Sequence, residues 1–127
     1  MPRATILIAE DDPVLRNLYV KKFSSSGIDV KTAENGEEAI ATITASPPDL
    51  LIADISMPKA DGFEILKKFP KKDRKFVIIM VTNYEEESVR SHALELGADE
   101  FLTKKSITIR SLVELVERLL AEQRSQS

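Results

Sequence analysis

The sequence predicts a three-layer α/β fold built on a five-stranded parallel sheet. Short, solid apolar segments at Thr5–Ala9, Leu50–Ala53 and 76–81 alternate with stretches in which apolar residues recur at helical spacing. Solid apolar segments are typical of strands buried on both faces, and alternation of strands with helices is typical of βαβ units. Because parallel crossovers are right-handed, we expect helices on both faces of the sheet.

Capping and turn residues mark the first two helices. Asp12, followed by a proline, is a typical N-cap with proline at the first helical position, so a helix begins there. A weaker strand is expected at 27–32. Asn35, with Glu38 three residues later, starts a second helix, which the prolines at 47–48 end.

Similar signals order the second half of the chain. A turn at Asp61 and Gly62 opens a third helical region, and a helix at about 85–96 stops at Gly97. A short strand at about 100–102 precedes a final helix whose apolar residues are Ile109, Leu112, Val113, Val116, Leu119 and Leu120. These elements give five strands and five helices in alternation.

Length and composition narrow the classes of function. The chain has 127 residues, 43% of them hydrophobic, which is enough for one independently folded domain. It contains no cysteine and a single histidine, which excludes cysteine zinc sites and thiol catalysis. No apolar run approaches the roughly 20 residues of a membrane span, so a cytoplasmic protein is expected. The net charge of −3 argues against direct nucleic-acid binding.

Polar residues gather at the carboxyl ends of the predicted strands, where ligands bind in open parallel sheets. Glu10 and Asp11 follow the first strand, Asp54 the third, Thr82 the fourth and Lys104 the fifth. Two carboxylates about 4 Å apart repel by roughly 4 kcal/mol at an effective dielectric of 20, so a cation must compensate. Oxygen ligands without histidine or cysteine suit Mg²⁺.

The same residue types suit phosphoryl transfer. An aspartate can accept a phosphoryl group as a carboxylate nucleophile, while the surrounding protein positions groups and neutralises charge. Lys104 offers a positive point charge and Thr82 a hydroxyl donor on the side where a phosphoryl group would lie.

Four segments carry a family resemblance. They are ILIAEDDP at 6–13, DLLIADISMPKADG at 49–62, VIIMVTN at 77–83 and GADEFLTKK at 97–105. In this order and spacing they resemble the marker segments of response regulator receiver domains. The resemblance implies a flavodoxin-like fold with strand order 2-1-3-4-5. Residues 1–122 would form the single receiver domain, and residues 123–127 a flexible tail.

The resemblance also implies a role for each polar residue at the sheet edge. Asp54 would be the phosphoacceptor, and Mg²⁺ would be held by Glu10, Asp11, Asp54 and the backbone carbonyl of Ser56. Thr82 corresponds to the switch hydroxyl, Phe101 to the switch aromatic, and Lys104 to the lysine that pairs with the phosphoryl group. Asp12 is interpreted instead as the helix N-cap.

Partners follow from the same resemblance. A sensor histidine kinase or a phosphotransfer protein would donate the phosphoryl group, and the domain would catalyse only its own phosphorylation and dephosphorylation. A target protein would bind the face made by the fourth helix, the fifth strand and the fifth helix. A monomer is expected, with dimerisation on phosphorylation left open.

Two departures from the family pattern bear on this interpretation. Lys105 stands where most receivers have a proline preceded by a cis bond, and a cis bond before a non-proline residue costs about 2.5 to 4 kcal/mol. Phe101 lacks the hydroxyl of the commoner tyrosine. The Lys105 departure alone favours the alternative hypothesis, a receiver-like scaffold that binds partners without phosphorylation. The presence of Glu10, Asp11, Asp54, Thr82 and Lys104 argues against this alternative.

Three other readings of the sequence are less favoured. An aspartate-nucleophile phosphohydrolase would need a second aspartate at position 56, which is serine. A phosphotransfer domain using His92 would be an all-helical bundle, so His92 is interpreted as a surface residue. The basic segment 67–75, with six of the 18 basic residues, could be a docking patch for an acidic partner or nucleic acid, but it is interpreted as a solvated connection.

Overall fold

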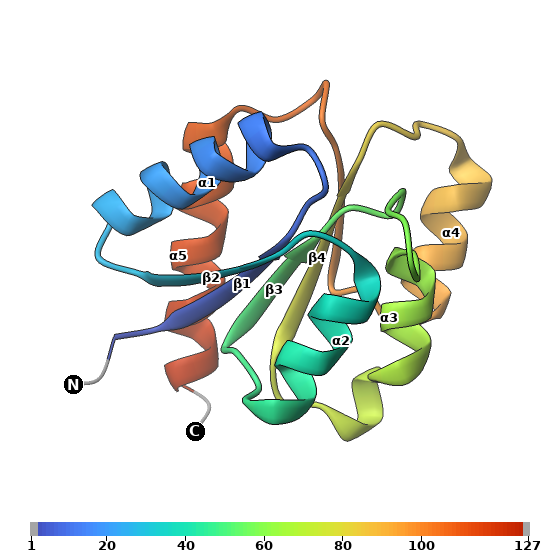
Figure 1. Cartoon of the computed structure of the whole chain (residues 1–127), viewed down its shortest axis with the longest axis horizontal. Helices are drawn as coiled ribbons and strands as arrows, with labels where there is room; N and C mark the ends of the chain where they lie inside the picture. The colour runs from blue at the N-terminus through green and yellow to red at the C-terminus, as the bar shows by residue number, and fades with distance from the viewer. Residues whose placement is uncertain (1–2, 126–127) are drawn as a thin grey trace.

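A computed structural model describes residues 3–125 and contains one five-stranded parallel sheet (Figure 1). Its strand order is β2-β1-β3-β4-β5, which confirms the predicted topology. The strands are β1 at Thr5–Ala9, β2 at Asp29–Ala33, β3 at Leu50–Ala53, β4 at Val77–Thr82 and β5 at Glu100–Thr103.

Helices cover both faces of this sheet. The described residues form α1 at Pro13–Ser25, α2 at Gly36–Ala45, α3 at Gly62–Lys68, α4 at Glu87–Glu95 and α5 at Ile109–Ser125. A 3₁₀ turn, η1, lies at Lys71–Asp73. In Figure 1, α1 and α5 lie on one side of the sheet, and α2, α3 and α4 lie on the other. The three-layer arrangement predicted from the alternation is confirmed.

Alternate residues of each strand divide the core into two apolar clusters. Ile6 and Ile8 of β1 face α1 and α5, where they join Phe23 and Val116. Leu7 faces the opposite way, into the cluster formed with α2, α3 and α4. The central strands are buried on both faces, which explains why their sequences are solidly apolar. Strand β2 is an edge strand with exposed polar residues, which explains its weaker signal.

Three predicted helix starts are confirmed by side-chain caps. The Asp12 carboxylate accepts hydrogen bonds from the backbone N–H groups of Val14 and Leu15 at the start of α1. Asn35 accepts from Glu38 at 2.8 Å, and Asp61 caps α3 in the same way. Each cap satisfies donors that have no partner within the helix.

The last helix reaches into the segment for which the sequence predicts a tail. Helix α5 continues through Ser125, and the Gln123 side-chain amide donates a hydrogen bond of 2.8 Å to the carbonyl of Lys75. Residues 123–125 are thus helical, and residues 126 and 127 of the expected tail lie outside the described residues. Within residues 3–125, no helix is both long and apolar enough to cross a membrane.

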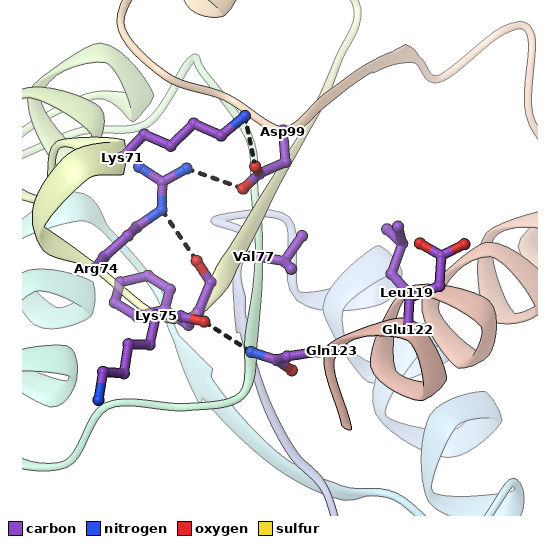
Figure 2. Close-up of a pocket in the computed structure, with 9 residues that line it drawn as sticks. Lys71, Arg74, Lys75, Val77, Asp99, Leu119, Glu122 and Gln123 are labelled. Atoms are coloured by element: carbon purple, nitrogen blue, oxygen red, sulfur yellow. Dashed lines mark hydrogen bonds and ion pairs between the residues drawn. The ribbon is translucent and has the colours of Figure 1, made fainter. Parts of the chain in front are cut away.

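The basic segment 67–75 is more than a solvated connection, because Arg74 is buried within it. Only 3% of the Arg74 side chain is exposed, and its guanidinium donates to the carbonyls of Phe69, Phe76 and Gly97. It also pairs with the Asp99 carboxylate at 2.9 Å. Figure 2 shows the Arg74 side chain pointing at Asp99. This side chain therefore ties the segment before β4 to the turn between α4 and β5.

Asp99 accepts from several groups at this junction. Its Oδ2 accepts the backbone N–H of Ile78 at 2.8 Å as well as Arg74, and its Oδ1 lies 3.1 Å from Nζ of Lys71. Burial alone would raise the pKa of Asp99, but these hydrogen bonds and charges outweigh it and hold the pKa below its ordinary value. The ionised carboxylate is therefore the stabilising form.

We predict that Asp99→Asn lowers the free energy of unfolding by about 1.5 to 3 kcal/mol at neutral pH, the range for hydrogen bonds to charged groups. A carboxylate with a lowered folded-state pKa stabilises the protein above its unfolded pKa of about 3.9. That stabilisation is lost as the pH falls through the lower folded-state pKa, so the difference from wild type should shrink below about pH 4. Urea denaturation across this pH range measures it.

The matched control is Asp73→Asn, which removes the same charge from an exposed position of η1. This variant should unfold like the wild type at every pH. A difference between Asp99→Asn and the wild type that stayed constant down to pH values well below about 3 would contradict the assigned role of the Asp99 charge.

Candidate functional site

Three carboxylates meet at the carboxyl ends of two adjacent strands. Glu10 and Asp11 follow β1, and Asp54 follows β3; one oxygen from each lies within 4.8 Å of the other two. Strands β1 and β3 are where the strand order reverses, the usual place for a ligand in an open α/β sheet. Glu10 and Asp54 are buried, whereas Asp11 is exposed. The predicted convergence of these residues is present in the structure.

Lys104 lies between the two buried carboxylates. Its Nζ is 2.7 Å from Oδ2 of Asp54 and 3.0 Å from Oε1 of Glu10. Lys104 reaches this position from the end of β5, and its backbone N–H donates to the carbonyl of Thr82 at 2.7 Å. The lysine thus compensates the repulsion between the carboxylates that the sequence predicts.

Backbone donors satisfy the remaining carboxylate oxygens. Oε2 of Glu10 accepts from the backbone N–H of Asp12 at 3.2 Å, and Oδ1 of Asp54 accepts from that of Ser56 at 3.0 Å. Both buried carboxylates are therefore held by one backbone donor and one shared cation. The backbone amide of Asp54 is itself fixed by the carbonyl of Ala9 at 3.1 Å.

Burial and charge act together on the ionisation of the site. Burial raises the pKa of Glu10 above its ordinary value, and hydrogen bonds from Lys104 and Asp12 only partly offset it. Burial would lower the pKa of Lys104, but hydrogen bonds to Asp54 and Glu10 reverse this and raise that pKa. Lys104 therefore stays charged at neutral pH, as a cation facing an excess of carboxylates.

The carboxylates could hold a metal ion. Asp11, Glu10 and Asp54 offer only oxygen donors, and the described part of the chain brings no histidine to this cluster. Such a donor set suits a hard divalent cation rather than zinc or copper. Asp11 is the exposed member, so a cation could reach the cluster from solvent through it.

Thr82 and Phe101 lie on the adjacent strands β4 and β5. The Thr82 hydroxyl is fully buried and accepts a 3.2 Å hydrogen bond from the backbone N–H of Tyr84. Phe101 is buried in the cluster with α4, and the Arg90 guanidinium lies 5.9 Å from the centre of its ring. Nη1 of Arg90 also donates to the carbonyl of Phe101 at 3.4 Å.

The loop after Lys104 differs from the family pattern, as the sequence indicates. The described residues contain no cis peptide bond, so the bond between Lys104 and Lys105 is trans. The Lys105 side chain is mostly exposed and lies 3.8 Å from the carboxylate of Glu85, in the neighbouring loop. His92, as expected, is exposed on α4, where its ring packs 4.6 Å from that of Phe63.

Two neighbours of the site are not identified by sequence reasoning. Arg16 donates from Nη1 to the carbonyl of Glu10 at 2.9 Å and pairs with Glu34 at 3.3 Å. Tyr19 lies at an apolar position of α1. Burial raises the pKa of its hydroxyl, and the nearby charge of Lys104 lowers that pKa in part. Helical periodicity identifies Tyr19 as a core residue, and only the packing of α1 shows that it lies near the site.

Comparison with known proteins agrees with this geometry. The family described as the response regulator receiver domain matches residues 6–117. The chain is 38% identical over 99 residues to the alkaline phosphatase synthesis transcriptional regulatory protein PhoP of Bacillus subtilis, covering 78% of this chain and 41% of that protein. It is 37% identical over 114 residues to the transcriptional regulatory protein TrcR of Mycobacterium tuberculosis, covering 90% and 43%.

A solved structure shows the same fold. The receiver domain protein (CheY-like) from Methanospirillum hungatei superimposes with a TM-score of 0.92 at 28% identity, covering 99% of this chain and all of that one. The chain belongs to the response regulator receiver domain family of two-component signalling. It spans less than half the length of PhoP and TrcR.

We predict that Lys104→Met lowers the free energy of unfolding by about 2 kcal/mol or more, because it leaves two buried carboxylates without their shared cation. Urea denaturation at neutral pH in the presence of EDTA measures this. The matched control is Lys105→Met, which removes the adjacent exposed charge and should change stability by less than about 0.5 kcal/mol. Equal effects of the two substitutions would show that the buried lysine does not compensate the carboxylates.

Proposed function

We propose that Asp54 accepts a phosphoryl group from a histidine kinase or a phosphotransfer protein in an Mg²⁺-dependent reaction. The observation that carries this proposal is the placement of Asp54, with an acidic cluster on one side and Lys104 2.7 Å away. Glu10, Asp11, Asp54 and the backbone carbonyl of Ser56 would hold Mg²⁺. The alternative, a scaffold that binds partners without phosphorylation, would need neither the cation pocket nor the lysine.

The chain's own residues suit each part of this transfer. A carboxylate oxygen of Asp54 forms the new O–P bond as the N–P bond of the donor's phosphohistidine breaks, and the departing imidazole takes up a proton. Lys104 faces the negative charge of the transferred group. Bound Mg²⁺ would neutralise charge on the phosphoryl oxygens and help to orient them. Water hydrolysing the acyl phosphate would restore the aspartate.

The switch would begin at Thr82. A phosphoryl group on Asp54 adds acceptor oxygens near the Thr82 hydroxyl, which would then exchange its contact with the Tyr84 amide for one with the phosphoryl group. Phe101 and α4 would follow, because the ring packs between this strand edge and the helix. The surface of α4, β5 and α5 would thus present a changed face to a target protein.

Partners and domain limits are part of the proposal. Residues 1–122 would act as one receiver domain, monomeric before phosphorylation, with no nucleic-acid contact of its own. PhoP, TrcR and NtrC are described as transcriptional regulators, and this chain matches less than half of each. Output would pass to an effector or a separate target protein through the α4–β5–α5 face.

The decisive experiment is intact-mass spectrometry after incubation with acetyl phosphate, with and without Mg²⁺. The wild type should gain one phosphoryl group only with Mg²⁺, and Asp54→Asn should gain none. Asp49→Asn is the matched control, since Asp49 lies at the opposite end of β3 and should leave the adduct unchanged. An adduct on Asp54→Asn would contradict the assignment of Asp54 as the phosphoacceptor. A wild type that forms no adduct with any phosphoryl donor would favour the scaffold that binds partners without phosphorylation.

Two further substitutions separate metal binding from signalling. Asp11→Ala should remove most of the Mg²⁺ dependence, because it deletes the exposed oxygen ligand. Lys104→Ala should still accept the phosphoryl group. Phosphorylation of this variant should not shift the amide resonances of α4 and β5 in ¹⁵N NMR spectra. Spectral changes in Lys104→Ala equal to those of the wild type would remove the lysine from the switch.

A further inference from the structure

The loop between β3 and α3 has an unusual backbone. Lys59 and Ala60 have positive φ values of 50° and 83°, a backbone conformation that residues with a Cβ rarely adopt. These residues follow Ser56 by only a few positions, in the loop that begins at Asp54. The surrounding structure must therefore hold the loop in this shape.

Contacts with the start of α2 fix the far part of the loop. The carbonyl of Lys59 accepts the backbone N–H of Glu37 at 2.7 Å, and that of Pro58 accepts the N–H of Gly36 at 3.4 Å. These N–H groups lie in the first turn of α2, where no intrahelical acceptor is available. The loop carbonyls thus complete the cap that Asn35 begins.

Gly36 allows this approach because it has no side chain. A Cβ at position 36 would lie 2.8 Å from Cβ of Ala60 and closer still to the carbonyl oxygen of Ala60. Backbone atoms cannot yield as the end of a flexible side chain does. Glycine is therefore required at position 36 because two backbone segments approach each other closely there.

The near part of the loop is fixed as well. The backbone N–H of Gly62 donates to the carbonyl of Ile55 at 2.9 Å, and the N–H of Ser56 donates to the Asp54 carboxylate at 3.0 Å. Ser56 lies between this anchor and the Pro58 contact with Gly36. Its backbone carbonyl consequently has little freedom to move independently of α2.

We propose that Gly36 is a positioning residue for the metal site, acting through the β3–α3 loop on the carbonyl of Ser56. This inference rests on the proposed function, in which that carbonyl is an Mg²⁺ ligand. Gly36 touches neither the ion nor the phosphoryl group. Gly36 sets the distance between α2 and the β3–α3 loop, and the loop in turn sets the position of the Ser56 carbonyl.

The test is Mg²⁺ affinity measured by isothermal titration calorimetry on Gly36→Ala. The new methyl group should displace the loop and weaken Mg²⁺ binding by about tenfold or more, the loss seen when groups that orient metal ligands are removed. In ¹⁵N NMR spectra of the metal-free variant, the amide resonances of residues 54–60 should shift. Both readouts are independent of phosphorylation.

One control variant separates positioning of the metal ligand from a general loss of stability. Gly27→Ala is the control, because Gly27 has a positive φ of 82°, which strains an alanine, but its Cβ would meet nothing within 4 Å. It should destabilise the fold while leaving Mg²⁺ affinity unchanged.

If Gly36→Ala does not fold, Glu37→Pro replaces it. Proline is tolerated in the first helical turn and removes the N–H that Lys59 accepts, so Mg²⁺ binding should weaken in the same way. Wild-type affinity in a folded Gly36→Ala or Glu37→Pro protein would overturn the inference and leave the proposed function intact. Equal loss of affinity in Gly27→Ala would also overturn it, and a wild type that binds no Mg²⁺ would overturn both.

Discussion

The charge balance around Lys104 is the interaction on which the site depends. Two buried carboxylates, Glu10 and Asp54, stand at the ends of adjacent strands, and one ammonium group lies within 3.0 Å of both. A lysine presents a compact charge on a flexible stem, so it can shift toward a new anion without losing a fixed set of hydrogen bonds. Under the proposed function, a phosphoryl group on Asp54 would meet this same ammonium group.

A second ion pair, at the opposite end of the sheet, is held more rigidly than the pairs made by Lys104. There Arg74 pairs with Asp99, and its guanidinium is also bound by the carbonyls of Phe69, Phe76 and Gly97. All three nitrogens of the planar group donate hydrogen bonds, and only 3% of the side chain is exposed. That network fixes two loops in one arrangement. The Lys104 site, by contrast, has more carboxylates than cations, and the exposed Asp11 leaves it open to solvent.

Much of this arrangement is predictable from the sequence because it depends on patterns along the chain. Solid apolar segments identified the central strands, Asp12 and Asn35 marked helix starts, and polar residues after each strand identified the acidic cluster and Lys104. The limits of strand β2 are harder to predict from sequence because an edge strand needs few apolar residues. The roles of Ser56, Thr82 and Phe101 came from family resemblance, and their chemistry remains a proposal.

The features that escaped prediction are contacts between segments distant in sequence. Arg74 lies in a run of lysines, and nothing in that run shows that its side chain turns inward to meet Asp99. Ala60 gives no sign of a positive φ, because glycine or asparagine is the usual signal for one. Gly36 follows the predicted cap Asn35 in the sequence, yet its lack of a side chain matters only because Ala60 lies against it. The loop's geometry is therefore set by its contacts with the start of α2, which no pattern along the chain reveals.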